Sequence, residues 1–134
     1  MSLTVGLVAC SKSKANQPMT AAALYTSPLF RKGADYCRRH YDHWFILSAL
    51  HGLVAPKTVL TPYDVTLNRQ NLDLRRAWTN KVIAALRRRR LLHAKFFLHA
   101  GRSYVDMLLD RLDCECPLRG LGISAQLAWY KERQ

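Results

Sequence analysis

The stretch Leu3-Thr-Val-Gly-Leu-Val-Ala9 (LTVGLVA) is followed directly by Cys10-Ser-Lys-Ser-Lys14 (CSKSK). The first part is a run of β-favouring apolar residues without a helical period, which is typical of a strand buried on both faces. The second part replaces that run with a thiol and two alternating pairs of hydroxyl and ammonium groups. The sequence therefore predicts a buried first strand that ends in a polar loop.

Further along the chain, strand patterns alternate with helix patterns. Apolar runs predict strands over residues 43–49 and 95–100, and a short fourth strand near 113–118. Helical spacing predicts one helix that begins at Pro28 with Ser27 as its N-cap, and further helices over 71–90, 101–112 and 124–131. This alternation predicts one α/β domain over residues 1–134, a three-layer fold with a mainly parallel sheet of about four strands and helices on both faces.

Between the second strand and the next helix lies a long segment, residues 54–68, with prolines and no clear period. Tyr63, Val65 and Leu67 give this segment apolar side chains that can anchor it. We therefore expect an ordered functional loop rather than a linker.

The composition bounds the class of partner. The chain has 134 residues and 49% hydrophobic content, enough for one core, and its 21 Lys and Arg against 9 Asp and Glu give a net charge of +12. Such an excess favours polyanionic partners, nucleic acid first, then nucleotides or an anionic membrane surface. No apolar run approaches the roughly 20 residues of a spanning helix. The first residues lack the basic lead of a signal peptide. We expect a cytoplasmic protein without a membrane partner.

The four cysteines lack the paired C-x-x-C spacing of a structural zinc site. In a reducing compartment they are expected to be free thiols, and no metal or cofactor is predicted. The alternative is a metal held by Cys114 and Cys116 with some of the five histidines. On a strand, those two thiols would share one face.

In a parallel sheet, the loops that leave the carboxyl ends of the strands lie along one edge and form the ligand crevice. Here those loops are residues 10–14, 48–52 and 99–102. The sequence therefore predicts that three polar clusters, far apart in the chain, converge on one site.

The first loop offers Ser11 and Ser13 hydroxyls with Lys12 and Lys14 ammoniums, groups that hold phosphate or carboxylate. It has no glycine, so it is not a Walker loop. Lys14 is a candidate nucleophile, base or anion ligand, and Cys10 is a candidate nucleophile if a neighbouring cation lowers its pKa. The alternatives are a solvated turn and a small buried cysteine.

The second loop pairs Ser48 with His51, and Gly52 allows a sharp backbone reversal. Because there is no G-x-S-x-G elbow, a hydrolase triad is not expected. His51 is a candidate for acid–base work or ligand orientation, or else it bonds its own turn. The long loop adds the Tyr63 phenol and the Asp64 carboxylate, although Asp64 is also suited to capping a turn.

The third loop places Gly101 and Arg102 at the start of a helix, where Gly101 permits close approach of a ligand. An arginine there opposes the helix dipole, which favours an anion nearby. A separate basic tract, Arg87 to Arg90, ends the preceding helix. It is either a phosphate-contacting patch or a solvated helix end.

Several of these stretches resemble known families. Phe45 to Val54 (FILSALHGLV), followed by Pro56 and then Pro62-Tyr63-Asp64, resembles the "LSGLYGL…P…PY" pattern of the YaaA peroxide-stress family, and Phe96 to Tyr104 resembles a later segment of it. The stretches CSKSK, YTSPLF, LSALHGL and PYD occur together in a group of small uncharacterised bacterial and phage domains. By these stretches the chain is identified as a member of that group.

Cys10 to Lys14, with Tyr25 and Ser27, is also similar to the Cys-x-x-x-Lys, Tyr and Ser pattern of archaeosine synthase, which modifies a base in transfer RNA. The chain departs from that pattern because no proline precedes Cys10 and no histidine follows Ser27 at the matching place. Both resemblances imply a nucleic-acid partner, DNA for YaaA and a transfer-RNA base for the synthase.

The leading hypothesis is a nucleic-acid-binding protein, with DNA favoured over RNA, that acts on a base or nucleotide by base modification or glycosidic-bond chemistry. Lys14, Cys10, His51 and Asp64 are its candidate catalytic residues. The candidate substrate-binding residues, with Tyr25 stacking on the base, are Ser11, Ser13, Tyr25, Ser27, Ser48, Gly52, Tyr63, Gly101 and Arg102. The alternatives are a non-catalytic DNA-binding protein of the stress-protective type and a nucleotide or small-anion enzyme without a polymer partner.

Overall fold

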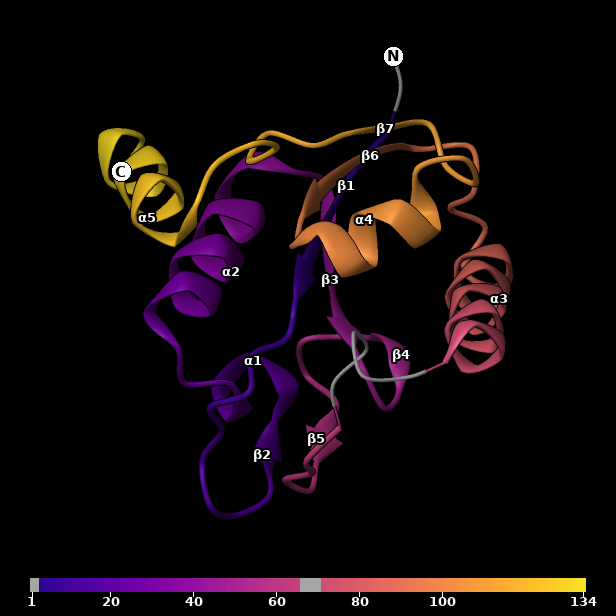
Figure 1. Cartoon of the computed structure of the whole chain (residues 1–134), viewed down its shortest axis with the longest axis horizontal. Helices are drawn as coiled ribbons and strands as arrows, with labels where there is room; N and C mark the ends of the chain where they lie inside the picture. Colours follow the sequence, from indigo (N-terminus) through magenta and orange to yellow (C-terminus); the bar gives the residue numbers. More distant parts are fainter. Residues whose placement is uncertain (1–2, 66–70) are drawn as a thin grey trace.

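The computed structural model describes residues 3–65 and 71–134 and is built on a five-stranded sheet in the order β4-β3-β1-β6-β7 (Figure 1). Its strands are β1 Thr4–Ala9, β3 His43–Ser48, β4 Gly52–Val54, β6 Lys95–His99 and β7 Cys114–Glu115. All neighbouring pairs are parallel except β3 with β4. The α/β fold with a mainly parallel sheet is confirmed. The sheet has one strand more than predicted because the chain turns back on β3 at Gly52.

β1 occupies the centre of the sheet and is hydrogen-bonded to β3 on one side and to β6 on the other. Val5 and Leu7 have no exposed surface, and Val8 is almost as fully buried. Side chains on both faces of the strand are therefore covered, which explains the uninterrupted apolar run in the sequence.

Helices cover both faces of this sheet (Figure 1). Val5 and Leu7 pack in a core cluster with residues of α3 Leu72–Arg88 and α4 Arg102–Leu108. Val8, on the opposite face, packs in a second cluster with residues of α2 Pro28–His40. The last helix, α5 Ile123–Glu132, packs against α2. The alternation of side chains along β1 thus separates two cores, one on each face.

The start of each long helix is set by a side-chain cap. Ser27 Oγ accepts a hydrogen bond of 3.1 Å from the backbone N–H of Phe30, and Pro28 follows as the first residue of α2. Asn71 caps α3 in the same way through Leu74. The predicted N-cap at Ser27 is confirmed, and its side chain satisfies a backbone donor that the helix leaves free.

Two segments outside the main sheet brace each other. The chain between β1 and α2 contains β2 Met19–Thr20 and α1 Ala21–Leu24, and the loop after β4 contains β5 Val59–Leu60. β2 pairs with β5 in an antiparallel two-stranded sheet. The part of the long loop that the structure describes, residues 54–65, is therefore braced by β2, in agreement with the predicted ordered loop. Its proposed anchor Leu67 lies outside the described residues.

β1 and β6 are adjacent strands whose chains leave in opposite directions. From β1 the chain proceeds to α2 on one face, whereas from β6 it enters α4 on the other. This divergence is a topological switch point, where α/β sheets leave a crevice at the carboxyl ends of the strands. The topology therefore predicts a ligand crevice just beyond Ala9 and His99.

The central strand also supplies the first testable prediction. A methyl group on Gly6 would overlap the ring of Tyr41 and lie 2.9 Å from Cys37 Sγ. Because β1 is paired on both edges, its backbone has little room to shift. We expect Gly6→Ala to lower the free energy of unfolding by about 1–3 kcal/mol, measured by urea denaturation.

Gly122→Ala is the matched control, since nothing lies within 4 Å of the corresponding methyl position. Because Gly122 is the N-cap of α5, where alanine is less favourable than glycine, we expect that change to cost no more than about 0.5–1 kcal/mol. Equal effects of the two substitutions would contradict the close packing of Tyr41 over β1.

Candidate functional site

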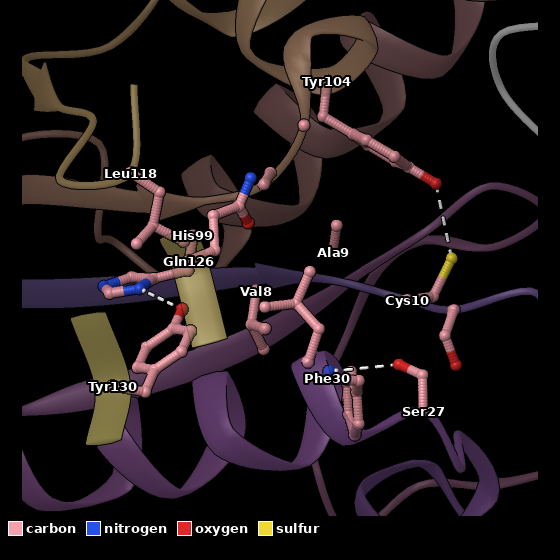
Figure 2. A pocket seen from close by; sticks show the side chains of 14 residues that line it. Val8, Ala9, Cys10, Ser27, Phe30, His99, Tyr104, Leu118, Gln126 and Tyr130 are labelled. Carbon is pink, nitrogen blue, oxygen red and sulfur yellow. Dashed lines mark hydrogen bonds between the residues drawn. The ribbon is translucent and has the colours of Figure 1, made fainter. Parts of the chain in front are cut away.

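A pocket of about 220 Å³ lies at the carboxyl ends of β1 and β6 (Figure 2). Its walls come from the ends of both strands, the first turns of α2 and α4, and one face of α5. Its polar side chains include Cys10, Ser11, Ser27, His99, Tyr104 and Tyr130. The pocket therefore occupies the crevice expected at the topological switch point.

Cys10 is held at the mouth of this pocket by the sheet itself. Its backbone N–H donates to the carbonyl of Leu47 at 2.9 Å, which continues the pairing of β1 with β3 by one residue. Its Sγ lies 3.3 Å from the hydroxyl of Tyr104, and Figure 2 shows this phenol reaching from α4 toward the thiol. Burial raises the pKa of Tyr104, so its hydroxyl stays protonated and can donate.

His99 is the buried polar group on the opposite wall. Its Nε2 and Nδ1 each lie 2.7 Å from a phenol oxygen, of Tyr41 and Tyr130 respectively. Burial lowers the pKa of His99 to about 4, so the imidazole is neutral at pH 7, donating through one nitrogen and accepting through the other. The sequence does not indicate that His99 and Tyr130 meet, because the two residues lie 31 positions apart and no local pattern links them.

A second polar cluster lies at the end of β3. The Tyr63 hydroxyl is hydrogen-bonded to Tyr25 Oη at 2.5 Å and to Ser48 Oγ at 2.7 Å. Lys14 Nζ lies 4.4 Å from the centre of the Tyr63 ring and donates to the carbonyl of Lys12. Lys14 is thus held over an aromatic face beside the pocket rather than in its wall.

His51 belongs to the same cluster. Its backbone N–H donates to Ser48 Oγ at 3.0 Å, and its ring stands edge-on to Tyr63 with 5.4 Å between the ring centres. Burial, followed by the charge of Lys81, lowers its pKa. The neutral imidazole is therefore the main form at pH 7, which suits a proton acceptor.

The structure brings the three predicted loops to one edge but changes several roles. Tyr25 and Ser48 have no exposed surface, so the predicted stacking of Tyr25 on a base is wrong, and both residues instead hold Tyr63. Gly52 is buried against Lys81 and Val82 rather than open to a ligand. Its φ of +78° shows that the turn requires glycine, so its part is structural.

The remaining candidates divide between the pocket wall and the open surface. Ser11, Ser27 and Gly101 line the pocket, although Ser27 also caps α2. Ser13 is exposed, and its carbonyl accepts a hydrogen bond of 2.8 Å from Ser11 Oγ. Asp64 is exposed in the loop just after Tyr63. Their positions therefore allow contact with a ligand at this edge.

The basic tract lies at the opposite edge of the sheet (Figure 1). The tract ends α3, and β6 is the next element of the chain. β6 starts beside the beginning of β1, where the Lys95 N–H donates a hydrogen bond to the Leu3 carbonyl. Arg89 packs over the ring of Phe45, near the start of β3. The tract therefore lies near the amino ends of the strands, whereas the pocket lies at their carboxyl ends.

Arg90 occupies a strained position within this tract. The helix ends in a Schellman pattern, in which Leu91 N–H donates to the Leu86 carbonyl and Arg90 N–H to the Arg87 carbonyl. Arg90 has a φ of 59°, the left-handed conformation that usually selects glycine. A charged residue is thus retained where glycine would be more stable.

The cysteines and acidic groups give no metal site within residues 3–65 and 71–134, where no cluster of three His, Cys, Asp or Glu side chains occurs. Cys37 is buried, which raises its pKa and removes it from reaction with solvent. Cys114 and Cys116 are partly buried near the edge strand β7. In the same described ranges, no helix is long and apolar enough to cross a membrane.

The neutral state of His99 makes a pH prediction. In the unfolded chain its pKa lies near 6.5, so between pH 6.5 and pH 4 the unfolded chain binds a proton that the folded chain does not. Stability is therefore present above pH 6.5 and is lost as the pH falls toward 4. The shift corresponds to about 3 kcal/mol of unfolding free energy, measurable by urea denaturation across this range.

His99→Asn is the comparison variant, and we expect its stability to fall less steeply over the same pH range. As a second measurement, the His99 ring resonances of the folded wild type should stay constant from pH 7.5 to pH 5.5. Titration of the folded ring near pH 6.5 would contradict the buried, doubly hydrogen-bonded state.

The sequence model of a family of unknown function (DUF6884) matches residues 5–132. No curated protein and no solved structure matches the chain. The family match agrees with the predicted place of the chain in an uncharacterised domain family. The resemblances to the YaaA family and to archaeosine synthase stay predictions.

Proposed function

The chain belongs to this family of unknown function (DUF6884), and from its own site we propose that it binds nucleic acid and acts on one base or nucleotide in the pocket between β1 and β6. The observation that carries the proposal is the pocket at the switch point, lined by a thiol, a serine hydroxyl and a phenol. Concave sites with a few converging polar groups are the usual place of small-ligand chemistry in such sheets.

The size of the pocket supports a single base as its occupant. Drug-sized ligands take pockets of about 300–1,000 Å³, and this one measures about 220 Å³. Its wall is mixed, with Phe30 and Leu118 beside polar groups, which suits a flat heterocycle with hydrogen-bonding edges. A base in a duplex would have to leave the stack to enter.

Charge around the pocket supports an anionic substrate. Lys14 lies in the loop after β1, and Arg31 follows the first turn of α2, a turn without acidic residues. Helix dipoles favour acidic side chains at that end, so cations there are better explained by an anion than by the helix. The net charge of +12 adds long-range attraction for any polyanion.

In the proposed reaction, base modification or glycosidic-bond cleavage, Lys14 is the nucleophile or anion ligand. Cys10 and Ser11 contact the base from the pocket wall, and the Tyr104 hydroxyl is hydrogen-bonded to the thiol. His51 and Asp64 transfer protons, since the neutral His51 imidazole stands beside Tyr63 in the cluster that also holds Lys14.

A second candidate function is an enzyme for a free nucleotide or small anion, without a polymer partner. It is favoured by the position of the basic tract, which lies near the amino ends of the strands, whereas the pocket lies at the carboxyl ends of β1 and β6. The third alternative, a non-catalytic DNA-binding protein of the stress-protective type, needs the tract and not the pocket. The two predictions below separate these functions.

The first concerns the chemistry. We expect Lys14→Ala and His51→Ala each to lower the rate of base modification or base release by about 10²–10⁴-fold. Lys12→Ala is the matched control, because Lys12 is an exposed neighbour with the same charge, and it should retain the wild-type rate. The measurement is mass spectrometry of nucleosides and free bases after incubation with DNA and with transfer RNA.

Wild-type rates in both Lys14→Ala and His51→Ala would contradict the assignment of chemistry to this cluster. Binding of DNA by the wild type, with no product from either nucleic acid, would favour the non-catalytic alternative.

The second prediction concerns the basic tract, Arg87 to Arg90. Arg90→Gly should raise the free energy of unfolding by about 0.5–1 kcal/mol, because glycine adopts the left-handed conformation without strain. It should also weaken DNA binding and flatten its salt dependence by up to about 0.9 in the log–log slope for one phosphate contact. Urea denaturation and binding titrations at several salt concentrations measure the two effects.

Arg38→Gln is the control for charge, since Arg38 is an exposed helix arginine paired with Asp35 on α2. We expect it to leave the salt slope unchanged. If Arg90→Gly binds DNA as the wild type does, the tract is only a helix end and the free-nucleotide enzyme gains support.

A further inference from the structure

A second cavity of about 350 Å³ adjoins the pocket. It is lined by Ala100, Arg102, Val105, Asp106, Cys116, Arg119 and Gly120. Ala100 lines both hollows. Two pairs of consecutive residues are divided between them: Gly101 and Leu118 line the pocket, whereas Arg102 and Arg119 line the second cavity. The two hollows are thus separated only by the walls that these segments form.

The second cavity carries two guanidinium groups against one carboxylate. Arg102 Nε lies 3.5 Å from Asp106 Oδ2, and the two side chains are 92% and 54% exposed. Such an open pair is weak and leaves most of the Arg102 N–H donors free. Within residues 3–65 and 71–134, Arg119 forms no ion pair. The cavity therefore offers unused donors and a net positive charge.

The backbone beside Arg119 leaves this wall open. The Arg119 N–H donates to the Cys116 carbonyl at 3.0 Å, which closes a turn. Gly120 follows with a φ of +81°, and nothing lies within 4 Å of the place where a side chain would begin. The turn thus sets Arg119 at the rim and keeps the space beside it free of side chains.

We propose that the second cavity binds the phosphate of the nucleotide whose base occupies the pocket. Planar guanidinium groups donate paired N–H bonds that match phosphate oxygens. A ring-sized pocket beside a cationic cavity also matches a nucleotide, in which the sugar separates base and phosphate. This inference rests on the proposed function and specifies its substrate as a phosphorylated nucleoside unit, free or within a strand.

The test compares nucleosides with their 5′-monophosphates. For the common ribonucleosides and deoxyribonucleosides, calorimetric titration should show at least about tenfold tighter binding of the monophosphate, the effect of roughly one good charge-assisted contact. Arg119→Gln should reduce that ratio toward one while leaving nucleoside affinity unchanged, and Arg102→Gln should also reduce the ratio. Arg111→Gln is the matched control, because Arg111 is an exposed arginine that contacts Asn80 and lines neither hollow.

Binding titrations with short single-stranded oligonucleotides distinguish a phosphodiester within a strand from the phosphate of a free nucleotide. Dependence on Arg119 for oligonucleotides alone assigns the cavity to a strand phosphodiester, whereas dependence for monophosphates as well assigns it to free nucleotides. Both results support the phosphate site.

Equal affinity for nucleosides and monophosphates, unaffected by Arg119→Gln in every arm, would overturn the inference and leave the proposed base pocket standing. If no nucleoside, monophosphate or oligonucleotide binds, and orthophosphate does not shift the Arg119 Nε–Hε resonance, both the inference and the proposed function fail. A shift of that resonance by orthophosphate without any nucleoside binding would keep the anion site and overturn the base pocket.

Discussion

The double burial of β1 is the constraint on which the rest of the structure depends. The strand is hydrogen-bonded along both edges and covered on both faces, so an unpaired polar side chain within it would cost several kcal/mol. Polar groups therefore lie at the two ends of this run, at Thr4, whose hydroxyl donates to Asp42, and at Cys10 and the residues that follow. Because the chain leaves β1 and β6 toward opposite faces, the space beyond these ends stays unfilled and becomes the pocket.

Buried phenols give this edge of the sheet its rigidity. On one side of Cys10, Tyr63 is held by Tyr25 and Ser48. Across the pocket, His99 is held between Tyr41 and Tyr130. Each network satisfies groups that would be costly to bury alone, and each links elements distant in the chain. Side chains that must meet a ligand thus stand on a fixed frame rather than on a free loop.

Positive charge lies both near the pocket and in the tract at the end of α3, two places that the net charge alone does not distinguish. Lys14 lies over the ring of Tyr63 beside the pocket, and Arg119 lines the adjoining cavity. The tract at the end of α3 lies at the other edge, and between exposed charges the attraction is largely screened beyond about 8 Å at physiological salt. In the proposed function, the tract can therefore attract or hold a polymer, whereas contacts with a base fall to residues around the pocket.

The sequence by itself determined the parallel α/β frame and the edge on which its polar loops meet, because hydrophobic periodicity is local and parallel strands end together. It did not reveal β2, α1 or β5, since pieces of two to four residues carry no period. Only the tertiary structure decided the partners within the site. Cys10 meets Tyr104 across 94 positions of the chain, and His99 meets Tyr130 across 31. Such pairs depend on how α4 and α5 pack against the sheet. Tertiary packing also decided that Tyr25 is buried and that Arg119 borders a cavity. It placed the basic tract away from the pocket as well.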